Sequence, residues 1–80
     1  MNKHCWNWFY NNVRKESNRF YGVEIAFIYC GVIITNMNNN NRAEFCGDDF
    51  IKLFDDVQMY MIHNFKRRVA VIHIHTSNNK

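Results

Sequence analysis

The sequence predicts a small single α+β domain in which an antiparallel sheet of three to four strands packs against two helices. Two segments, 4–19 and 48–65, repeat apolar side chains at the helical spacing of three and four residues. Residues 22–37 and 68–76 are rich in β-branched and aromatic side chains, as strands are, and residues 42–45 suit a short returning strand. The predicted element order is therefore α-β-β-(β)-α-β, with one sheet covered by helices.

Length and composition limit the kind of protein this can be. A chain of 80 residues with 48% hydrophobic and 16% aromatic residues is globular, because disordered chains lack aromatic and β-branched side chains. A domain of this size buries only roughly 60–65% of the surface of its unfolded chain. We expect one compact domain over 1–80, no large enclosed active-site pocket, and a frayed polar tail at 77–80.

The first segment, 4–19, is predicted as a helix. Trp6, Phe9 and Val13 share one helical face, and Asn2 is a suitable N-cap. Alternating aromatic residues at its start would also suit a strand, but the polar residues 15–18 break that alternation.

The middle of the chain is predicted as β structure. Residues 22–37 form either one long bent strand or two strands, because Gly31 permits a turn or a bulge. Asn38–Asn41 is a polar run whose side chains tolerate turn conformations, and Arg42–Phe45 suits a short returning strand. We expect a hairpin across the Asn run.

The second helix is predicted over 48–65. Asp48 is a suitable N-cap, and Asp49 suits the positive end of the helix dipole. The apolar stripe that faces the core consists of Phe50, Leu53, Phe54, Val57, Met61 and Phe65.

The last predicted element is a strand over 68–76. Its apolar Val69 and Val71 would suit edge pairing with a second copy, and hence a homodimer. His73 and His75 share one face of this strand and could hold a metal ion together with His4, Cys46 or His63. No other spacing supports a zinc site, so the sequence leaves metal binding open and we assign no ligand.

The three cysteines, Cys5, Cys30 and Cys46, are an odd number without a repeating spacing. This usage is typical of buried free thiols in a reducing cytoplasm. No apolar leader follows the start, and the longest apolar run, Ile25–Ile34, is about half a transmembrane helix. We therefore expect a cytoplasmic protein that does not enter a membrane.

The sequence shows no catalytic set. A thiolate at Cys46 would be opposed by Asp48 and Asp49, and the Asp55–Asp56 pair lies on the solvated side of its helix. No Gly-rich phosphate loop or second acidic element completes a site. We expect neither an enzyme nor a bound cofactor.

Charge is segregated along the chain, although the formal net charge is only +3. The first twenty residues are basic, five of the seven acids lie between 44 and 56, and Lys66–Arg68 form a second basic run. A surface with separate basic and acidic regions can bind partners of either charge.

Two helical faces are candidate partner-binding surfaces. On the polar face of the second helix, the adaptable side chain of Met59 is surrounded by Lys52, Asp55, Asp56 and His63, as an interface anchor is by a polar rim. On the first helix, Trp8 lies on the side of Lys15 and Arg19. There it would serve as a protein hot spot, stack on a nucleic-acid base, or pack on another element.

These features predict a small non-enzymatic protein-binding module. In size, Asn-rich composition and strand–helix order, the chain resembles small phage-encoded inhibitors of host or immune machinery, including many anti-CRISPR proteins. The resemblance implies inhibition by occlusion of a larger target, for which a basic nucleic-acid-handling protein would match the acidic helix. The alternative is a weak nucleic-acid-binding protein that uses Trp8, Lys15, Arg19, Arg67 and Arg68.

Overall fold

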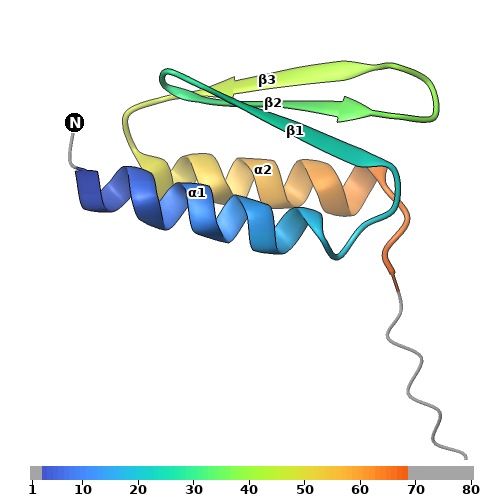
Figure 1. The fold of residues 1–80 in the computed structure, drawn as a ribbon, viewed down its shortest axis with the longest axis horizontal. Coiled ribbons are helices and arrows are strands. Elements are labelled where there is room, and N and C mark those ends of the chain that lie inside the picture. Colours follow the sequence, from blue (N-terminus) through green and yellow to red (C-terminus); the bar gives the residue numbers. More distant parts are fainter. Residues whose placement is uncertain (1–2, 69–80) are drawn as a thin grey trace, which may run out of the picture.

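The computed structural model describes residues 3–68, which form a three-stranded antiparallel sheet with two helices on one of its faces (Figure 1). The elements are α1 (Lys3–Ser17), β1 (Val23–Ile28), β2 (Gly31–Asn36), β3 (Arg42–Cys46) and α2 (Phe50–Asn64). The strand order is β1-β2-β3. The predicted α+β class is confirmed.

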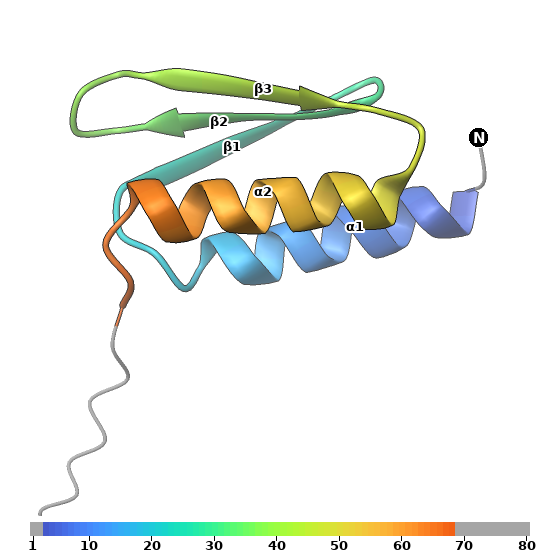
Figure 2. The same ribbon diagram turned by 180° about the vertical axis from the view of Figure 1, so that it is seen from behind.

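The two helices lie side by side and run in the same direction (Figures 1 and 2). The ring of Trp6, near the start of α1, lies 5.6 Å from that of Phe50, the first residue of α2. Both N-terminal ends therefore meet at one end of the domain, and the positive ends of both helix dipoles lie there.

Helix α1 follows the predicted apolar spacing. Phe9 and Val13 are completely buried, and Trp6 and Tyr10 pack on Phe27 of β1. The polar residues that argued against a strand form the end of this helix, which stops at Ser17.

Residues 22–37 form two strands, which decides between the two alternatives that the sequence left open. Tyr29–Cys30 is the connection, and Gly31 is the first residue of β2. The pairs Ile25–Ile34 and Phe27–Val32 face the helices. Gly31 is required by close approach, because a Cβ atom there would lie 1.7 Å from the carbonyl oxygen of Phe45.

The predicted hairpin turn across the Asn run is confirmed. Asn36 N donates to Asn41 O at 2.8 Å, and Asn40 adopts a left-handed φ of 63°. The side-chain oxygens of Asn36 and Asn39 accept from the backbone N–H two residues on, as Asx turns do. The Asn enrichment thus supplies local hydrogen bonds to a turn between β2 and β3.

The core lies between the sheet and the helix pair. It consists of Phe9, Val13, Phe20, Val32, Ile34, Phe50, Leu53, Val57 and Met61. Phe54 and Phe65, which the helical spacing also placed in the stripe of α2, are only partly buried at its margin.

The N-cap of α2 is Asp49, one residue later than predicted. Asp49 has an extended backbone, and its Oδ1 accepts from Lys52 N at 3.1 Å. An N-cap side chain accepts from the backbone N–H two or three residues later, as Asp49 does here. Asp48 lies before the cap and is exposed.

We expect Asp49→Ala to lower the free energy of unfolding by about 1 kcal/mol, because the N–H of Lys52 loses its acceptor. Thermal denaturation followed by circular dichroism should show a fall in Tm of roughly 4–8 °C. Asp48→Ala is the matched control, and its Tm should stay close to that of the wild type. Equal losses in the two variants would contradict the assignment of the cap.

After α2 the chain pairs with the segment between α1 and β1. Tyr21 N donates to Lys66 O at 2.9 Å, and Arg68 N donates to Arg19 O at 2.7 Å. Phe20 and Arg67 form an isolated antiparallel bridge. The remainder of the predicted strand, with Val69, Val71, His73 and His75, and the tail at 77–80 lie outside the described residues.

Candidate functional site

The five predicted residues of α2 form one exposed face. Lys52, Asp55, Asp56, Met59 and His63 all have exposed side chains. Lys52 Nζ lies 3.2 Å from Asp56 Oδ2, an i,i+4 ion pair in solvent. Such pairs contribute little to stability, so both side chains can rearrange to meet a partner.

Trp8 packs across the helix pair and also keeps an exposed surface. Its ring contacts that of Phe54 edge-to-face, with 5.4 Å between the centroids, and 41% of the residue is exposed. Of the three roles considered for Trp8, packing on another element is the one that the structure shows directly. The contact also holds the indole in one orientation.

Three of the four basic residues of the predicted nucleic-acid surface, Arg19, Arg67 and Arg68, lie beyond the end of α1, whereas Lys15 is exposed within α1, about two turns from Trp8. Arg68 lies over the Tyr21 ring at 4.7 Å, and Arg67 lies over the Phe20 ring at 5.7 Å, beyond the end of α1. Arg19 Nε lies 3.8 Å from Oε1 of the buried Glu16. These arginines thus contact the protein itself, and Trp8 lies in the opposite half of α1.

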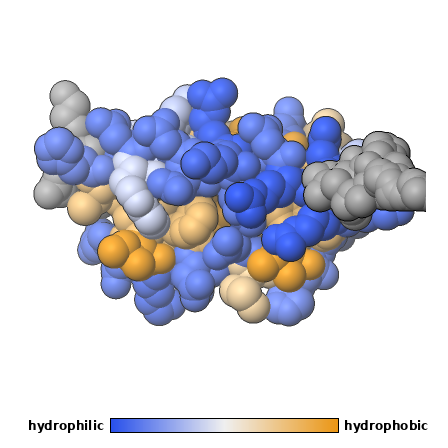
Figure 3. All heavy atoms as spheres, turned by 90° about the horizontal axis from the view of Figure 1, so that it is seen from below, coloured by the Kyte–Doolittle hydropathy of each residue, from blue (hydrophilic) through white to orange (hydrophobic). Residues whose placement is uncertain are grey.

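Two exposed isoleucines of α2 were not among the predicted partner-binding residues, because isoleucine is usually buried. Ile51 is 72% exposed and Ile62 is 43% exposed. Eleven residues are close to three helical turns, so both lie on one line along α2. Seen from the helix side, hydrophobic patches interrupt the hydrophilic surface (Figure 3).

We define the helix-layer surface by its four exposed large apolar residues and the charged residues of α2 beside them. The apolar members are Trp8, Ile51, Met59 and Ile62, and the polar members are Lys52, Asp55, Asp56 and His63.

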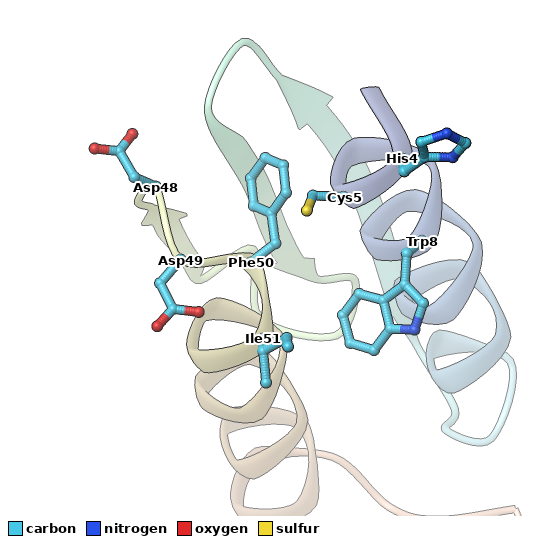
Figure 4. A pocket seen from close by; sticks show the side chains of 7 residues that line it. All are labelled: His4, Cys5, Trp8, Asp48, Asp49, Phe50 and Ile51. Atoms are coloured by element: carbon cyan, nitrogen blue, oxygen red, sulfur yellow. The ribbon is translucent and has the colours of Figure 1, made fainter. Parts of the chain in front are cut away.

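A hollow of about 470 Å³ opens at the end of this surface, between the starts of α1 and α2. It is lined by His4, Cys5, Trp8, Asp48, Asp49, Phe50 and Ile51 (Figure 4). The apolar side chains of Trp8, Phe50 and Ile51 line its interior, and the carboxylates of Asp48 and Asp49 lie at the α2 side. No spacing in the sequence indicated this hollow, because it depends on the parallel direction of the helices.

The expectation that all three cysteines are buried was wrong. Cys5 and Cys46 are exposed, and Cys30 is partly buried. Cys30 and Cys46 are hydrogen-bonded through their thiols, with 2.7 Å between the sulfurs. This hydrogen bond, then desolvation, then the nearby charges of Cys30 and Glu44 raise the pKa of Cys46 to about 11. The thiol of Cys46 is therefore a weaker acid than an ordinary cysteine thiol.

The described residues contain no metal-binding cluster. Within 3–68, no group of three or more His, Cys, Asp or Glu side chains converges on a position that could hold an ion. His73 and His75 lie outside this range, so the structure does not bear on that pair.

Comparison of the chain with models of protein families, with curated proteins and with solved structures gives no match. None of the helices in the part of the chain that the structure describes is long and apolar enough to cross a membrane. The structure thus defines a small α+β domain with an amphipathic outer surface on its helices.

Proposed function

We propose that the protein is a small protein-binding module that covers part of a larger protein with its helix-layer surface. The observation that carries the proposal is the exposure of Trp8, Ile51, Met59 and Ile62, by 41%, 72%, 44% and 43%, on two adjacent helices. These residues form two pairs, Trp8 with Ile51 at the hollow and Met59 with Ile62 one turn apart on α2. Exposed apolar side chains grouped within a polar rim are typical of protein interfaces, whereas single ones are common on any surface.

The opposite face of the domain is less suited to this role. Its exposed sheet residues are small or charged, namely Glu24, Ala26, Arg42, Glu44 and Cys46, and the isoleucines of this face, Ile28 and Ile33, are partly buried. The other exposed large apolar residues, Tyr21, Tyr29 and Met37, lie in connections between elements. Most of the exposed large apolar residues among those described, four of seven, therefore lie on the helix layer.

Trp8 is the strongest candidate for a hot spot on this surface. Tryptophan is enriched among residues that dominate binding energy, and a side chain already held in place loses little entropy on binding. The contact with Phe54 fixes the indole, and Ile51 lies across the hollow from it. A partner side chain that enters the hollow would be enclosed by both.

The charges favour a basic target. Asp55 and Asp56 lie beside the apolar residues of α2, and Asp48 and Asp49 line the hollow. A positive partner surface would be attracted to this end of the domain, most strongly at low salt. An inhibitor that occludes a basic, nucleic-acid-handling protein is the specific form of this proposal.

The test is affinity purification of the tagged chain from its native cells, followed by measurement of binding to any stoichiometric partner. We expect the double variant Ile51→Glu/Met59→Glu to bind at least about 30-fold more weakly, which corresponds to about 2 kcal/mol at an interface hot spot. Both side chains are exposed, so the Tm should change little.

Met37→Glu is the matched control, because Met37 is 53% exposed but lies in the β2–β3 connection. Its binding should equal that of the wild type. Wild-type affinity in the double variant would contradict the choice of surface. Binding to generic DNA or RNA at about 50 mM salt, with steep loss at higher salt, would instead support the nucleic-acid alternative.

A further inference from the structure

Cys30 and Cys46 are brought together by the backbone at one end of the sheet. Cys30 lies in the connection between β1 and β2, next to Gly31, and Gly31 is the partner of Cys46 in the β2–β3 ladder. Gly47 N donates to Cys30 O at 3.2 Å on the other side of Cys46. The two residues are therefore held between backbone contacts on both sides, sixteen positions apart in sequence.

Their side chains face each other and can be reached from solvent. The Sγ atoms are in contact at 2.7 Å, Cys46 is exposed and Cys30 is partly exposed. Glu44 Oε2 lies 3.7 Å from Cys46 Sγ. The third thiol, Cys5, is on α1 and lines the hollow between the starts of α1 and α2.

We propose that Cys30 and Cys46 form a dithiol site that reacts with low-molecular-weight disulfides, such as oxidised glutathione, to give an intramolecular disulfide. In the first step, one thiol loses its proton and its sulfur attacks the external disulfide, which forms a mixed disulfide and releases one thiolate. In the second step, the other thiol loses its proton and attacks the protein sulfur, which releases the second thiolate. The two released thiolates take up the two protons, so one external disulfide is reduced as two protein thiols are oxidised.

The new bond would join the β1–β2 connection to the last residue of β3, from which the chain leads into α2. Cys46 lines a shallow hollow together with Gly47, Asp49, Lys52 and Asp56. Oxidation would therefore fix the backbone next to the acidic part of the helix-layer surface. The dithiol proposal does not depend on partner binding, because its products are measured on the isolated protein.

The test equilibrates the reduced full-length chain with reduced and oxidised glutathione, quenches it with acid, and counts free thiols by alkylation and peptide mass mapping. We expect the three free thiols to fall to one, with Cys5 alone alkylated and the Cys30 and Cys46 peptides linked. We also expect Tm to rise on the order of 10 °C, because the bond restricts the unfolded chain between 30 and 46.

Three single variants make the result specific. Cys5→Ser should form the same internal bond at the same glutathione ratio. Cys30→Ser and Cys46→Ser should lose it and carry glutathione on the remaining partner. Linkage of Cys5 to either cysteine, disulfide-linked dimers, or separate glutathione adducts on Cys30 and Cys46 in the wild type would each overturn the proposal. The proposal would also be overturned if all three thiols stayed free at every glutathione ratio.

Discussion

Phe9→Ala is expected to lower the free energy of unfolding by about 3–5 kcal/mol, the usual range for removal of a fully buried aromatic ring. Phe9 is 0% exposed and stacks on Phe50 of α2 with 5.1 Å between ring centroids. It also contacts Phe27 of β1 edge-to-face at 6.3 Å. The ring thus joins both helices to the sheet, and no neighbouring side chain can fill its space without leaving another gap.

This loss is large relative to the whole stability of such a domain. At roughly 0.05–0.15 kcal/mol per residue, a chain of 80 residues has about 4–12 kcal/mol in total. Urea denaturation followed by circular dichroism measures the change through the midpoint and slope of the transition. Tyr29→Ala is the matched control, because Tyr29 is 95% exposed and should lose less than about 0.5 kcal/mol. Similar midpoints for the two variants would contradict the position of Phe9 in the core.

Gly31→Ala is expected to destabilise the domain by about 3 kcal/mol or more, as severe overpacking does. A Cβ atom at this position would lie 1.7 Å from Phe45 O and 2.8 Å from Phe45 C. Both are backbone atoms of the neighbouring strand, so no side-chain rotation relieves the overlap. The start of β2 would have to separate from β3, at the end of the sheet where β3 leads toward α2.

Gly47→Ala separates this steric effect from the general effect of adding a methyl group to glycine. A Cβ atom at 47 would meet only Leu53 Cδ1 at 4.0 Å, which is an ordinary contact. We expect its Tm to equal or exceed that of the wild type, because alanine reduces the entropy of the unfolded chain by roughly 0.4–1 kcal/mol where the conformation permits it. If Gly31→Ala melted at the same temperature as Gly47→Ala, the close approach of β2 and β3 would be wrong.

Local signals in the sequence were sufficient for the two helices and for the hairpin turn. The spacing of Phe9 and Val13 predicted α1, and the Asn run predicted the turn between β2 and β3. Both depend on neighbours within a few residues, where backbone sterics and side-chain hydrogen bonds act directly. The N-cap was misplaced by one residue because Asp48 and Asp49 are equally good caps by composition, and only the backbone geometry distinguishes them.

The candidate surface was predicted in part. Helical spacing was enough to place Met59 opposite the core stripe of α2 and to group it with Asp55 and Asp56. It was not enough for Ile51 and Ile62, because isoleucines at the margin of a stripe are buried or exposed according to which element packs beside them. The sequence likewise did not determine whether Trp8 is buried or exposed. In the structure its ring packs on Phe54, and 41% of the residue stays exposed.

The sequence by itself determined the class of the domain, its helices, its hairpin turn and the segregation of its charges, because these follow from periodicity and local chemistry. Only the tertiary structure decided which residues from distant parts of the chain lie side by side. The parallel direction of α1 and α2 creates the hollow beside Trp8 and Ile51, and the β2–β3 ladder brings Cys30 to Cys46. Both depend on contacts between residues far apart in the chain, which no local pattern specifies.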